Sequence, residues 1–327
     1  MTDWPIDWRE VVEEAKTRRI AEGLSQRALA ELAGVSAPTV NVFEQGDIKL
    51  NFASVVAILD ALGMIVKPGP PDSLNAFIHS ARRRWNELVE PLPADHPSRQ
   101  PKGHSEQAYS IAGIEPAASL SKLRTVLSQA PSTTGWTPFW VPTREAIRPT
   151  IQERVVECWL GKPDNDRAFN DAAHSDFWQI GRDGAAYLQR GYQEDGREFD
   201  AGTIFDLTLP IWRTAEVLMH ARWLARQLGA SENDEIRFSA RYTGLAGRLL
   251  AAWSKQRSGA LDDDFRSRTD SVDLKHDITL RALEHDLVPP VLEILTPLYE
   301  RFDGFQISAR LVEVQIEELH RSGQLHG

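Results

Sequence analysis

Residues 24–64, LSQRALAELAGVSAPTVNVFEQGDIKLNFASVVAILDALGM, decide the fold of the N-terminal part of the chain. Ser25 stands where a helix N-cap belongs. The helix that it begins carries an apolar row, formed by Leu29, Leu32 and Ala33. Gly34 then provides a sharp turn, because glycine enters the left-handed region of backbone conformation without strain. This stretch therefore predicts a short helix that ends in a tight turn.

A second short helix follows the turn. Ser36 is its N-cap, and a proline in the first turn is tolerated there. Three apolar residues point inward, namely Val40, Phe43 and Ile48, whereas Asn41, Val42 and Gln45 point outward. Two helices joined by a short turn that contains glycine are typical of the helix-turn-helix, whose second helix enters the DNA major groove. The alternative is a helical bundle that binds protein.

The segment resembles the XRE/Cro-repressor family over residues 11–64, through the pattern LSQxxLAxxxGVSxxTVxxxExG. The resemblance implies that Gln26 contacts a phosphate at the groove edge and that Gln45 and Lys49 contact the DNA backbone. It also places Ala37, Pro38, Asn41 and Val42 at base-facing positions. The DNA-binding residues predicted in this way are Gln26, Arg27, Ser36, Ala37, Pro38, Thr39, Asn41, Val42, Gln45 and Lys49.

Asn41 is the best candidate for base recognition, because a carboxamide can form two hydrogen bonds with an adenine edge. Ala37, Thr39 and Val42 offer methyl contacts, as to thymine. The recognition helix carries no Arg or Lys, which departs from the family pattern. Affinity must then depend on dimerisation or on flanking basic residues, because phosphate neutralisation supplies most non-specific affinity. The candidates are Lys16, Arg18, Arg19 and Arg27.

The composition indicates a globular protein of two domains in 327 residues. The net charge of −10 argues against a protein that coats nucleic acid indiscriminately. Residues 1–67 hold 7 Lys and Arg against 10 Asp and Glu, a net charge of −3, so attraction to DNA must come from a local patch. A single cysteine, Cys158, excludes an intrachain disulfide and is expected to be a buried, inert thiol. With no membrane-spanning run and no secretion signal, we expect a cytoplasmic protein.

The chain divides into three predicted regions. Residues 7–68 form the helix-turn-helix domain, with a first helix at 7–23 and a fourth at 52–62. Residues 69–117 form a helix at 73–88 and a proline-rich linker at 90–110, whose composition is typical of a semi-rigid or disordered segment. The arginine run at 82–84 is interpreted as a solvated helix face, with a supplementary phosphate contact as the alternative.

Residues 118–322 form the third region, predicted to be an α+β domain with a largely antiparallel sheet. A short helix is expected at 118–130, and longer helices at 211–228, 288–302 and 308–322. Strands are expected at 155–160, 176–180, 185–192, 203–209, 235–242, 248–254 and 271–280. The predicted fold class is therefore multidomain: an all-α helix-turn-helix bundle followed by an α+β domain.

The C-terminal region also carries a resemblance, through the segments ECWLG, AHSDFWQIGRDGAAYLQRGYQED and FDLTLPIWRTAEVLMHARWLARQLGA. Residues 120–322 are similar to the C-terminal part of bacterial proteins whose N-terminal half is an AlbA_2 (Schlafen-like) ATP-binding domain. The resemblance implies a module that occurs with different N-terminal domains. It carries no catalytic residue across.

No catalytic constellation is evident in this region. His174, Ser175 and Asp176 are three adjacent reactive types, but neighbours in a strand point to opposite faces. Glu216 and His220 share a helix face, yet companion metal ligands are missing. We therefore predict neither an enzyme nor a cofactor or metal site. An aromatic set packs a core, an oligomer interface or a ligand pocket: Trp136, Phe139, Trp140, Trp159, Phe177, Trp178, Tyr187, Tyr192, Trp212, Trp223, Tyr242 and Trp253.

The sequence thus predicts a DNA-binding transcription regulator, acting as a repressor through a homodimer on a palindromic operator in double-stranded DNA. The C-terminal domain is expected to sense a small molecule, bind a partner protein or oligomerise. The alternative is an antitoxin or immunity protein, whose C-terminal domain binds a partner protein while the helix-turn-helix regulates its own operon. No membrane partner is expected.

Overall fold

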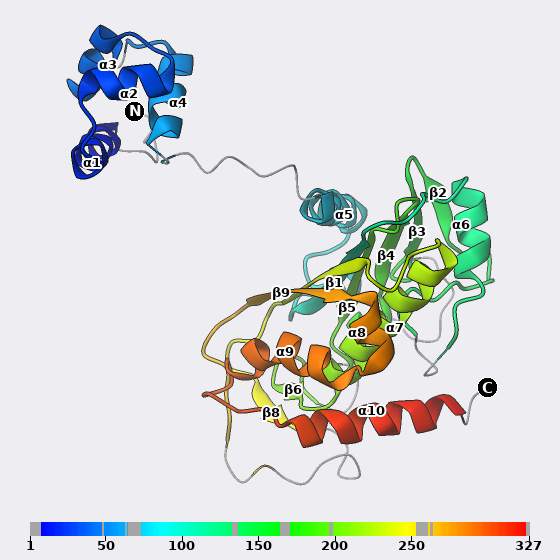
Figure 1. Cartoon of the computed structure of the whole chain (residues 1–327). Coiled ribbons are helices and arrows are strands. Elements are labelled where there is room, and N and C mark those ends of the chain that lie inside the picture. Colours follow the sequence, from blue (N-terminus) through cyan, green and yellow to red (C-terminus); the bar gives the residue numbers. More distant parts are fainter. Residues whose placement is uncertain are drawn as a thin grey trace. The chain divides into compact units, whose positions relative to one another are not determined.

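The computed structural model describes residues 8–47, 49–62, 64, 73–132, 137–163, 171–195, 199–252, 261 and 264–324, with side chains to residue 321. The chain divides into two compact units, residues 1–71 and residues 72–327 (Figure 1). Each unit has a hydrophobic core of its own. The second unit thus begins at residue 72, ahead of residue 118, where the sequence predicts the start of the C-terminal domain.

The first unit is a bundle of short helices. They are α1 (Trp8–Ala21), α2 (Gln26–Ala33), α3 (Ala37–Glu44) and α4 (Phe52–Ala61). Their shared core consists of Val12, Ala15, Leu29, Ala30, Val40, Phe43, Val55 and Ile58. The inward positions predicted for Val40 and Phe43 are confirmed, since neither side chain is exposed. The prediction for Ile48 falls outside the described residues.

Leu32, a member of the predicted apolar row, is exposed instead, and so is Ile20 on α1. Leu32 is 64% exposed and Ile20 is 61% exposed. The helix turns by 100° per residue, so Leu32 lies about 110° from the direction that Leu29, Ala30 and Ala33 share. Ile20 has a similar offset from the buried side of α1. Spacing by three residues is therefore insufficient in these short helices, whose buried stripe is narrow.

Side-chain caps and one glycine define the turn between α2 and α3. Ser25 Oγ accepts a hydrogen bond from the Ala28 N–H, 3.1 Å away, and Ser36 Oγ accepts one from the Thr39 N–H, 3.3 Å away. Gly34 has a φ of +66°, and its N–H donates to the carbonyl groups at the end of α2. The capping residues predicted from the sequence thus start both helices of the motif.

The second unit is built on a seven-stranded sheet with the order β2-β3-β4-β5-β1-β7-β9, in which every neighbouring pair is antiparallel. A separate parallel pair is formed by β6 and β8. The strands are β1 (His104–Ile111), β2 (Thr150–Gln152), β3 (Val155–Trp159), β4 (Phe177–Gly181), β5 (Ala186–Gly191), β6 (Ile204–Asp206), β7 (Glu235–Tyr242), β8 (Leu249–Ala251) and β9 (Val272–Thr279). The predicted α+β class with a largely antiparallel sheet is confirmed.

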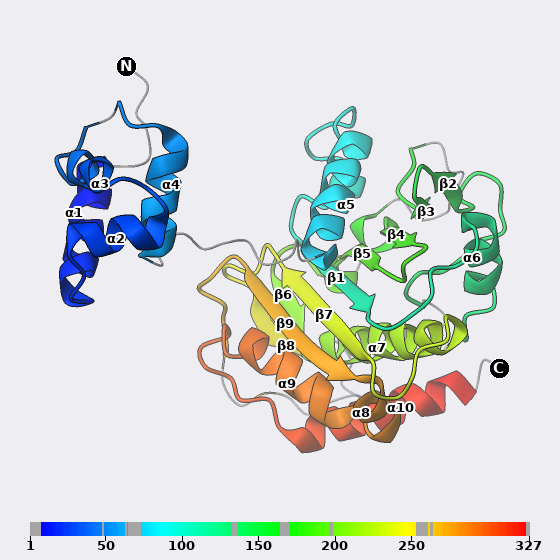
Figure 2. The ribbon, with the colours of Figure 1, turned by 45° about the horizontal axis from the view of Figure 1, so that its top comes forward.

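Helices cover both faces of this sheet (Figure 2). On one face, α5 (Ser73–Val89) packs over β1, β4 and β5. The other face carries the main core, in which alternate strand residues meet α7 (Leu209–Gln227) and α9 (Val288–Tyr299), and α10 (Ala309–Gln324) packs against these two helices. The remaining helices are α6 (Leu120–Leu127) and α8 (Leu280–His285). The helices predicted at 211–228, 288–302 and 308–322 thus correspond to α7, α9 and α10.

The proline-rich linker predicted at 90–110 is wrong. Residues 97–99 form a short 3-10 helix, and β1 occupies the central region of the sheet, between β5 and β7. The polar groups of this segment are bonded within the unit: Arg99 donates to two backbone carbonyls and Ser98 donates to the Gly161 carbonyl, 2.7 Å away. Composition gave a misleading prediction because buried polar residues with partners resemble the polar residues of a linker.

The arginine run at 82–84 binds α5 to the sheet. Arg82 Nε donates to Glu106 Oε2 on β1, 2.6 Å away, and Arg84 donates to Glu157 on β3, at 3.1 and 3.3 Å. Only the intervening Arg83 is exposed among the three. The predicted solvated face is therefore wrong for Arg82 and Arg84, because their guanidinium groups form ion pairs with strand carboxylates beneath the helix.

Arg248 is a fully buried ion within the second unit. Its guanidinium group donates to both carboxylate oxygens of Asp195, at 2.8 and 2.6 Å, and lies 4.5 Å from the centre of the Tyr192 ring. Its remaining bonds go to the carbonyl groups of Lys102, Ile204 and Gly244, all within 2.8 Å. One side chain thus joins the approach to β1, the strand β6 and the loop after β7.

Candidate nucleic-acid interface

The exposed side of α3 carries the residues predicted to contact DNA. Ser36, Pro38, Asn41 and Gln45 are exposed, as are Arg27 and Lys49, whereas Ala37, Thr39 and Val42 are half-buried. Val40 and Phe43 bury the opposite side of the same helix. The structure thus places Asn41 on the solvent side of α3, where a carboxamide is accessible to a base edge.

The first turn of α3 is held by a pair of hydroxyl groups. Ser36 Oγ and Thr39 Oγ1 are 2.7 Å apart, and Ser36 also caps the helix. The Thr39 hydroxyl therefore has a partner within the helix. The Thr39 methyl group is therefore the part of the side chain that we expect to contact a base.

The ends of α2 and α3 are joined by a charged network that was not predicted. Arg19 on α1 donates to both carboxylate oxygens of Glu44, the last residue of α3, at 2.5 and 3.0 Å. Gln26, the first residue of α2, donates to Glu44 Oε2 at 2.8 Å. Arg19 also donates to the Leu24 carbonyl, 2.7 Å away. The network fixes the orientation of α3 relative to α1 and α2.

This network changes the roles expected of two residues. The Arg19 side chain is 13% exposed and paired with a carboxylate, which argues against its use as a phosphate contact. Gln26 still has a second amide hydrogen. Burial raises the pKa of Glu44, but the hydrogen bonds from Arg19 and Gln26 outweigh this effect and hold the pKa below its ordinary value. The carboxylate is therefore ionised at neutral pH.

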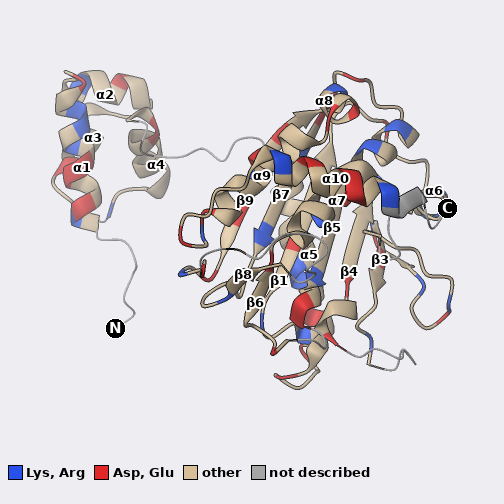
Figure 3. Cartoon of the chain, turned by 90° about the horizontal axis from the view of Figure 1, so that it is seen from below, with Lys and Arg blue, Asp and Glu red and all other residues tan. Residues whose placement is uncertain are grey.

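The other basic residues near the motif lie on the surface. Arg18 pairs with Glu14 at 2.9 Å and Arg27 with Glu31 at 3.7 Å, and all four side chains are about half exposed or more. Figure 3 shows both basic and acidic residues along α1. Exposed ion pairs contribute little to stability, so these arginines can turn toward phosphate groups at small cost.

Trp8 supports the end of α3 and was also not predicted. Its ring meets the Phe43 ring edge-on, with 5.7 Å between the centroids, and its Nε1–H donates to the Gly46 carbonyl, 3.0 Å away. A tryptophan at the start of the first helix is a weak sequence signal. Its contacts show that α1 supports the chain immediately after the recognition helix.

In the second unit, the adjacent residues His174, Ser175 and Asp176 each bind a different partner. His174 Nδ1 lies 2.6 Å from Asp171 Oδ1, and Ser175 Oγ donates to the Ala172 carbonyl, 2.8 Å away. Asp176 accepts two bonds from Arg190, at 2.9 and 2.6 Å. The arrangement is therefore no catalytic triad.

Glu216 and His220, the two residues considered as metal ligands, also bind different partners. Glu216 accepts a bond from Arg213, 2.6 Å away, whereas His220 Nδ1 lies 2.8 Å from the Tyr109 hydroxyl. Among the described residues, no group of three or more His, Cys, Asp and Glu side chains is placed to hold a metal ion. None of the helices in the described ranges combines the length and the apolar character needed to cross a membrane.

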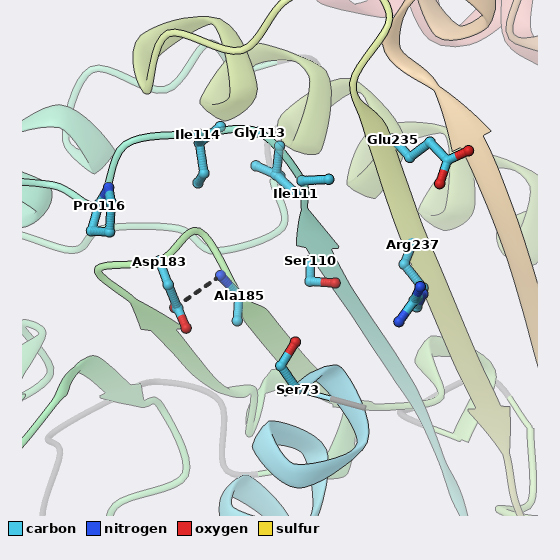
Figure 4. Close-up of a pocket in the computed structure, with 11 residues that line it drawn as sticks. Ser73, Ser110, Ile111, Gly113, Ile114, Pro116, Asp183, Ala185, Glu235 and Arg237 are labelled. Atoms are coloured by element: carbon cyan, nitrogen blue, oxygen red, sulfur yellow. Dashed lines mark hydrogen bonds between the residues drawn. The ribbon is translucent and has the colours of Figure 1, made fainter. Parts of the chain in front are cut away.

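A cavity of about 320 Å³ with a mixed polar and apolar lining lies at the end of the sheet, beside the start of α5 (Figure 4). Two of its charged lining residues have partners: Asp183 accepts from the Ala185 N–H, 3.3 Å away, and Arg237 pairs with Asp277 at 3.5 Å. Glu235 is the third charged residue that lines the cavity. We assign no ligand to it.

The aromatic residues of the second unit are mainly core residues, as one of the three interpretations held. Buried members are Phe139, Trp159, Phe177, Trp178, Tyr187, Tyr192, Trp212 and Tyr242. Trp140 is 42% exposed and Trp223 is half-buried. Trp136 and Trp253 fall outside the described residues. Cys158 is buried, and its thiol donates to the Ile147 carbonyl, 3.3 Å away.

Residues 10–65 match the family model described as a helix-turn-helix domain. No curated protein matches the chain. The matched range contains the four helices of the first unit apart from the first two residues of α1. The chain therefore carries an N-terminal helix-turn-helix domain, as predicted. The similarity of residues 120–322 to the AlbA_2-associated module stays a prediction.

Proposed function

We propose that this protein is a sequence-specific DNA-binding transcription regulator of the XRE type, which represses by occupying its operator. The supporting observation is the exposed side of α3, where Asn41 stands on a helix whose opposite side is buried in a helix-turn-helix bundle. Such a helix lies in the major groove and reads base edges with its outward side chains. The proposal assigns no reaction to the second unit.

The composition of α3 supports a homodimer. APTVNVFE contains no Arg or Lys, so one copy supplies few of the charge-assisted contacts that provide most DNA affinity. Two copies would place their recognition helices about 34 Å apart, one turn of the double helix, and read a palindrome. The second unit would provide oligomerisation or respond to a small molecule, and a protein acting on DNA in this way would work in the cytoplasm.

The test begins with selection of bound sequences from a random double-stranded DNA library by the full-length protein. Fluorescence anisotropy on the selected site then compares wild type with Asn41→Ala. We expect the substitution to weaken binding to the selected site by about tenfold or more, since a bidentate contact with a base is worth about 1–3 kcal/mol. Binding to unrelated DNA should stay the same.

Thr17→Ala is the matched control, because Thr17 is an exposed polar residue of α1 outside the motif. It should bind the selected site as wild type does. Failure to enrich any sequence at modest salt would refute the proposal and favour a bundle that binds protein. Equal losses on selected and unrelated DNA would refute the base-reading role of Asn41.

A further inference from the structure

A cavity on the helical side of the second unit contains a buried polar group without a partner. The cavity measures about 290 Å³ and is lined by His220, Arg222 and Trp223 of α7, with Thr137 and Pro138 opposite. His220 is 6% exposed. No hydrogen-bond partner for its Nε2 atom is present in the described part of the chain. An unsatisfied buried donor or acceptor destabilises the folded state, so this atom calls for an explanation.

The protonation of His220 follows from its neighbour. Burial lowers the pKa of His220 to about 3, so the imidazole is neutral. The buried Tyr109 hydroxyl lies 2.8 Å from Nδ1, and a phenol O–H needs an acceptor. Within the described residues, Nδ1 is the acceptor that this hydroxyl reaches, so the imidazole proton belongs on Nε2. His220 therefore presents an N–H donor on the edge of the ring remote from Tyr109.

The ring is held rigidly for this role. Its centroid lies 4.6 Å from that of Phe139, at an interplanar angle of 31°, and 5.6 Å from that of Trp223. Phe139 is fixed in turn against Tyr109 and Trp178 by edge-on contacts. A donor whose direction is set by packing is suited to recognising one acceptor.

The lining itself is balanced, with two carboxylates and two guanidinium groups, but Arg213, from outside the lining, neutralises one of the carboxylates. Glu216 pairs with Arg213, and Glu284 pairs with Arg226 through two bonds of 2.7 and 2.6 Å. Arg222 donates to the neutral Leu283 carbonyl, 3.0 Å away, and no carboxylate within the described ranges lies within 4.0 Å of it. The half-buried Trp223 indole adds an apolar surface beside this charge.

We infer that this cavity binds a small planar carboxylate, which accepts a hydrogen bond from His220 Nε2–H, pairs with Arg222 and lies against Trp223. The volume is at the lower end of the range for small-molecule sites, which restricts the ligand to one or two fused rings. The site is inferred from its geometry. Its role as the effector site of a DNA-binding regulator rests on the proposed function.

Titration calorimetry on the full-length protein with indole-3-carboxylate and indole-3-carboxamide tests the inference, because the two probes share a shape and differ in charge. We expect the acid to bind at least about tenfold more tightly than the amide, the usual gain from one charge-assisted contact. Arg222→Gln should remove that difference, and Trp223→Leu should weaken both probes. Arg241→Gln, on a strand of the sheet, should leave both affinities unchanged.

A separate readout follows His220 itself. In protein labelled with ¹⁵N-histidine, the Nε2-protonated form gives a distinct pair of nitrogen shifts, and the acid should move the Nε2 resonance. Equal binding of acid and amide, acid binding unaffected by Arg222→Gln, or an Nδ1-protonated ring would overturn the inference. Because no DNA is present, failure of the operator-binding test leaves these results standing. Unchanged operator affinity in saturating acid would overturn the effector role.

Discussion

Gln26 donates a hydrogen bond of 2.8 Å to Glu44, which joins the first residue of α2 to the last residue of α3. The same carboxylate receives both guanidinium bonds of Arg19. A base-reading helix must keep its direction to within a few degrees, since small displacements of a positioned group weaken its contacts strongly. The proposed placement of Asn41 in the groove thus depends on Glu44 and its hydrogen-bond partners.

Glu44→Gln should destabilise the first unit by about 1–3 kcal/mol, because it leaves the half-buried Arg19 without a counter-charge. The pKa of Glu44 is lowered in the folded protein, so its stabilising contribution is present above the ordinary carboxyl pKa and is lost as the pH falls through the folded value. Thermal unfolding from pH 3 to 7 should show a loss of stability at acid pH in wild type and a smaller loss in the variant. Glu31→Gln, at an exposed pair, is the control.

Gly34→Ala should destabilise the first unit by about 1–2 kcal/mol, because the residue has a φ of +66° that a Cβ disfavours. No atom lies within 4 Å of the added Cβ, so the loss is conformational and not steric. Gly34→Asn should cost less, since asparagine tolerates the left-handed region. Urea unfolding ranks the stabilities of wild type and the two variants. Equal stability of the alanine variant and wild type would show that the turn relaxes.

Arg84→Met should destabilise the second unit by about 1–3 kcal/mol, because it leaves the buried Glu157 with one amide partner, Gln179. Arg83→Met is the matched control on the same helix, since Arg83 is exposed. Hydrogen exchange of the α5 amides should rise in the first variant and stay the same in the second. Equal protection in both variants would show that the apolar contacts of α5 suffice to hold it.

Glu194→Gln should remove a pH dependence of stability. Burial raises the pKa of Glu194 to about 7, so the folded protein retains a proton that the unfolded chain loses at lower pH. Folded protein then binds more protons between the two pKa values, and stability falls as the pH rises from about 4.5 to 7. Glutamine keeps an acceptor for the Asp206 N–H, which Glu194 bonds at 2.9 Å. The variant should therefore melt at a higher temperature than wild type at pH 8.

Arg248→Met should destabilise the second unit by about 3–5 kcal/mol, because it leaves Asp195 and three backbone carbonyls without their buried partner. Arg268→Met is the control, since that side chain is 86% exposed. Denaturant midpoints compare the two. A loss for Arg248→Met no larger than that of the control would mean that water enters and replaces the guanidinium bonds.

The elements with local signals were predicted well. Ser25, Gly34 and Ser36 act over one helical turn, and the structure has each cap or turn where the pattern indicated it. Strands with alternating apolar residues, such as β7, were predicted to within a residue. The structure shows which of the proposed DNA-binding residues are exposed. Their contacts with DNA stay a prediction.

The long-range elements were missed. β1 carries Glu106 and Gln107, which are buried yet polar, so it lacks the alternation that identifies β7. Their partners, Arg82 and Thr214, lie 24 and 107 residues away, and no local window contains both members of such a pair. Arg19 and Glu44 are likewise 25 residues apart. Such pairings depend on the fold that they help to specify.

The position of β1 has a consequence for how the protein is made. β1 precedes all other strands of the sheet in the chain, yet its two neighbours are β5 (Ala186–Gly191) and β7 (Glu235–Tyr242). At about 5–20 residues per second, a ribosome needs roughly 6 to 25 s to pass from the end of β1 to the start of β7. The edge of β1 that pairs with β7 lacks its strand throughout that interval, and the edge that pairs with β5 lacks its strand until residue 191 is made; α5 is the element already made that packs on β1. The nascent chain is therefore most prone to aggregation in this interval, when chaperones have the most reason to bind it.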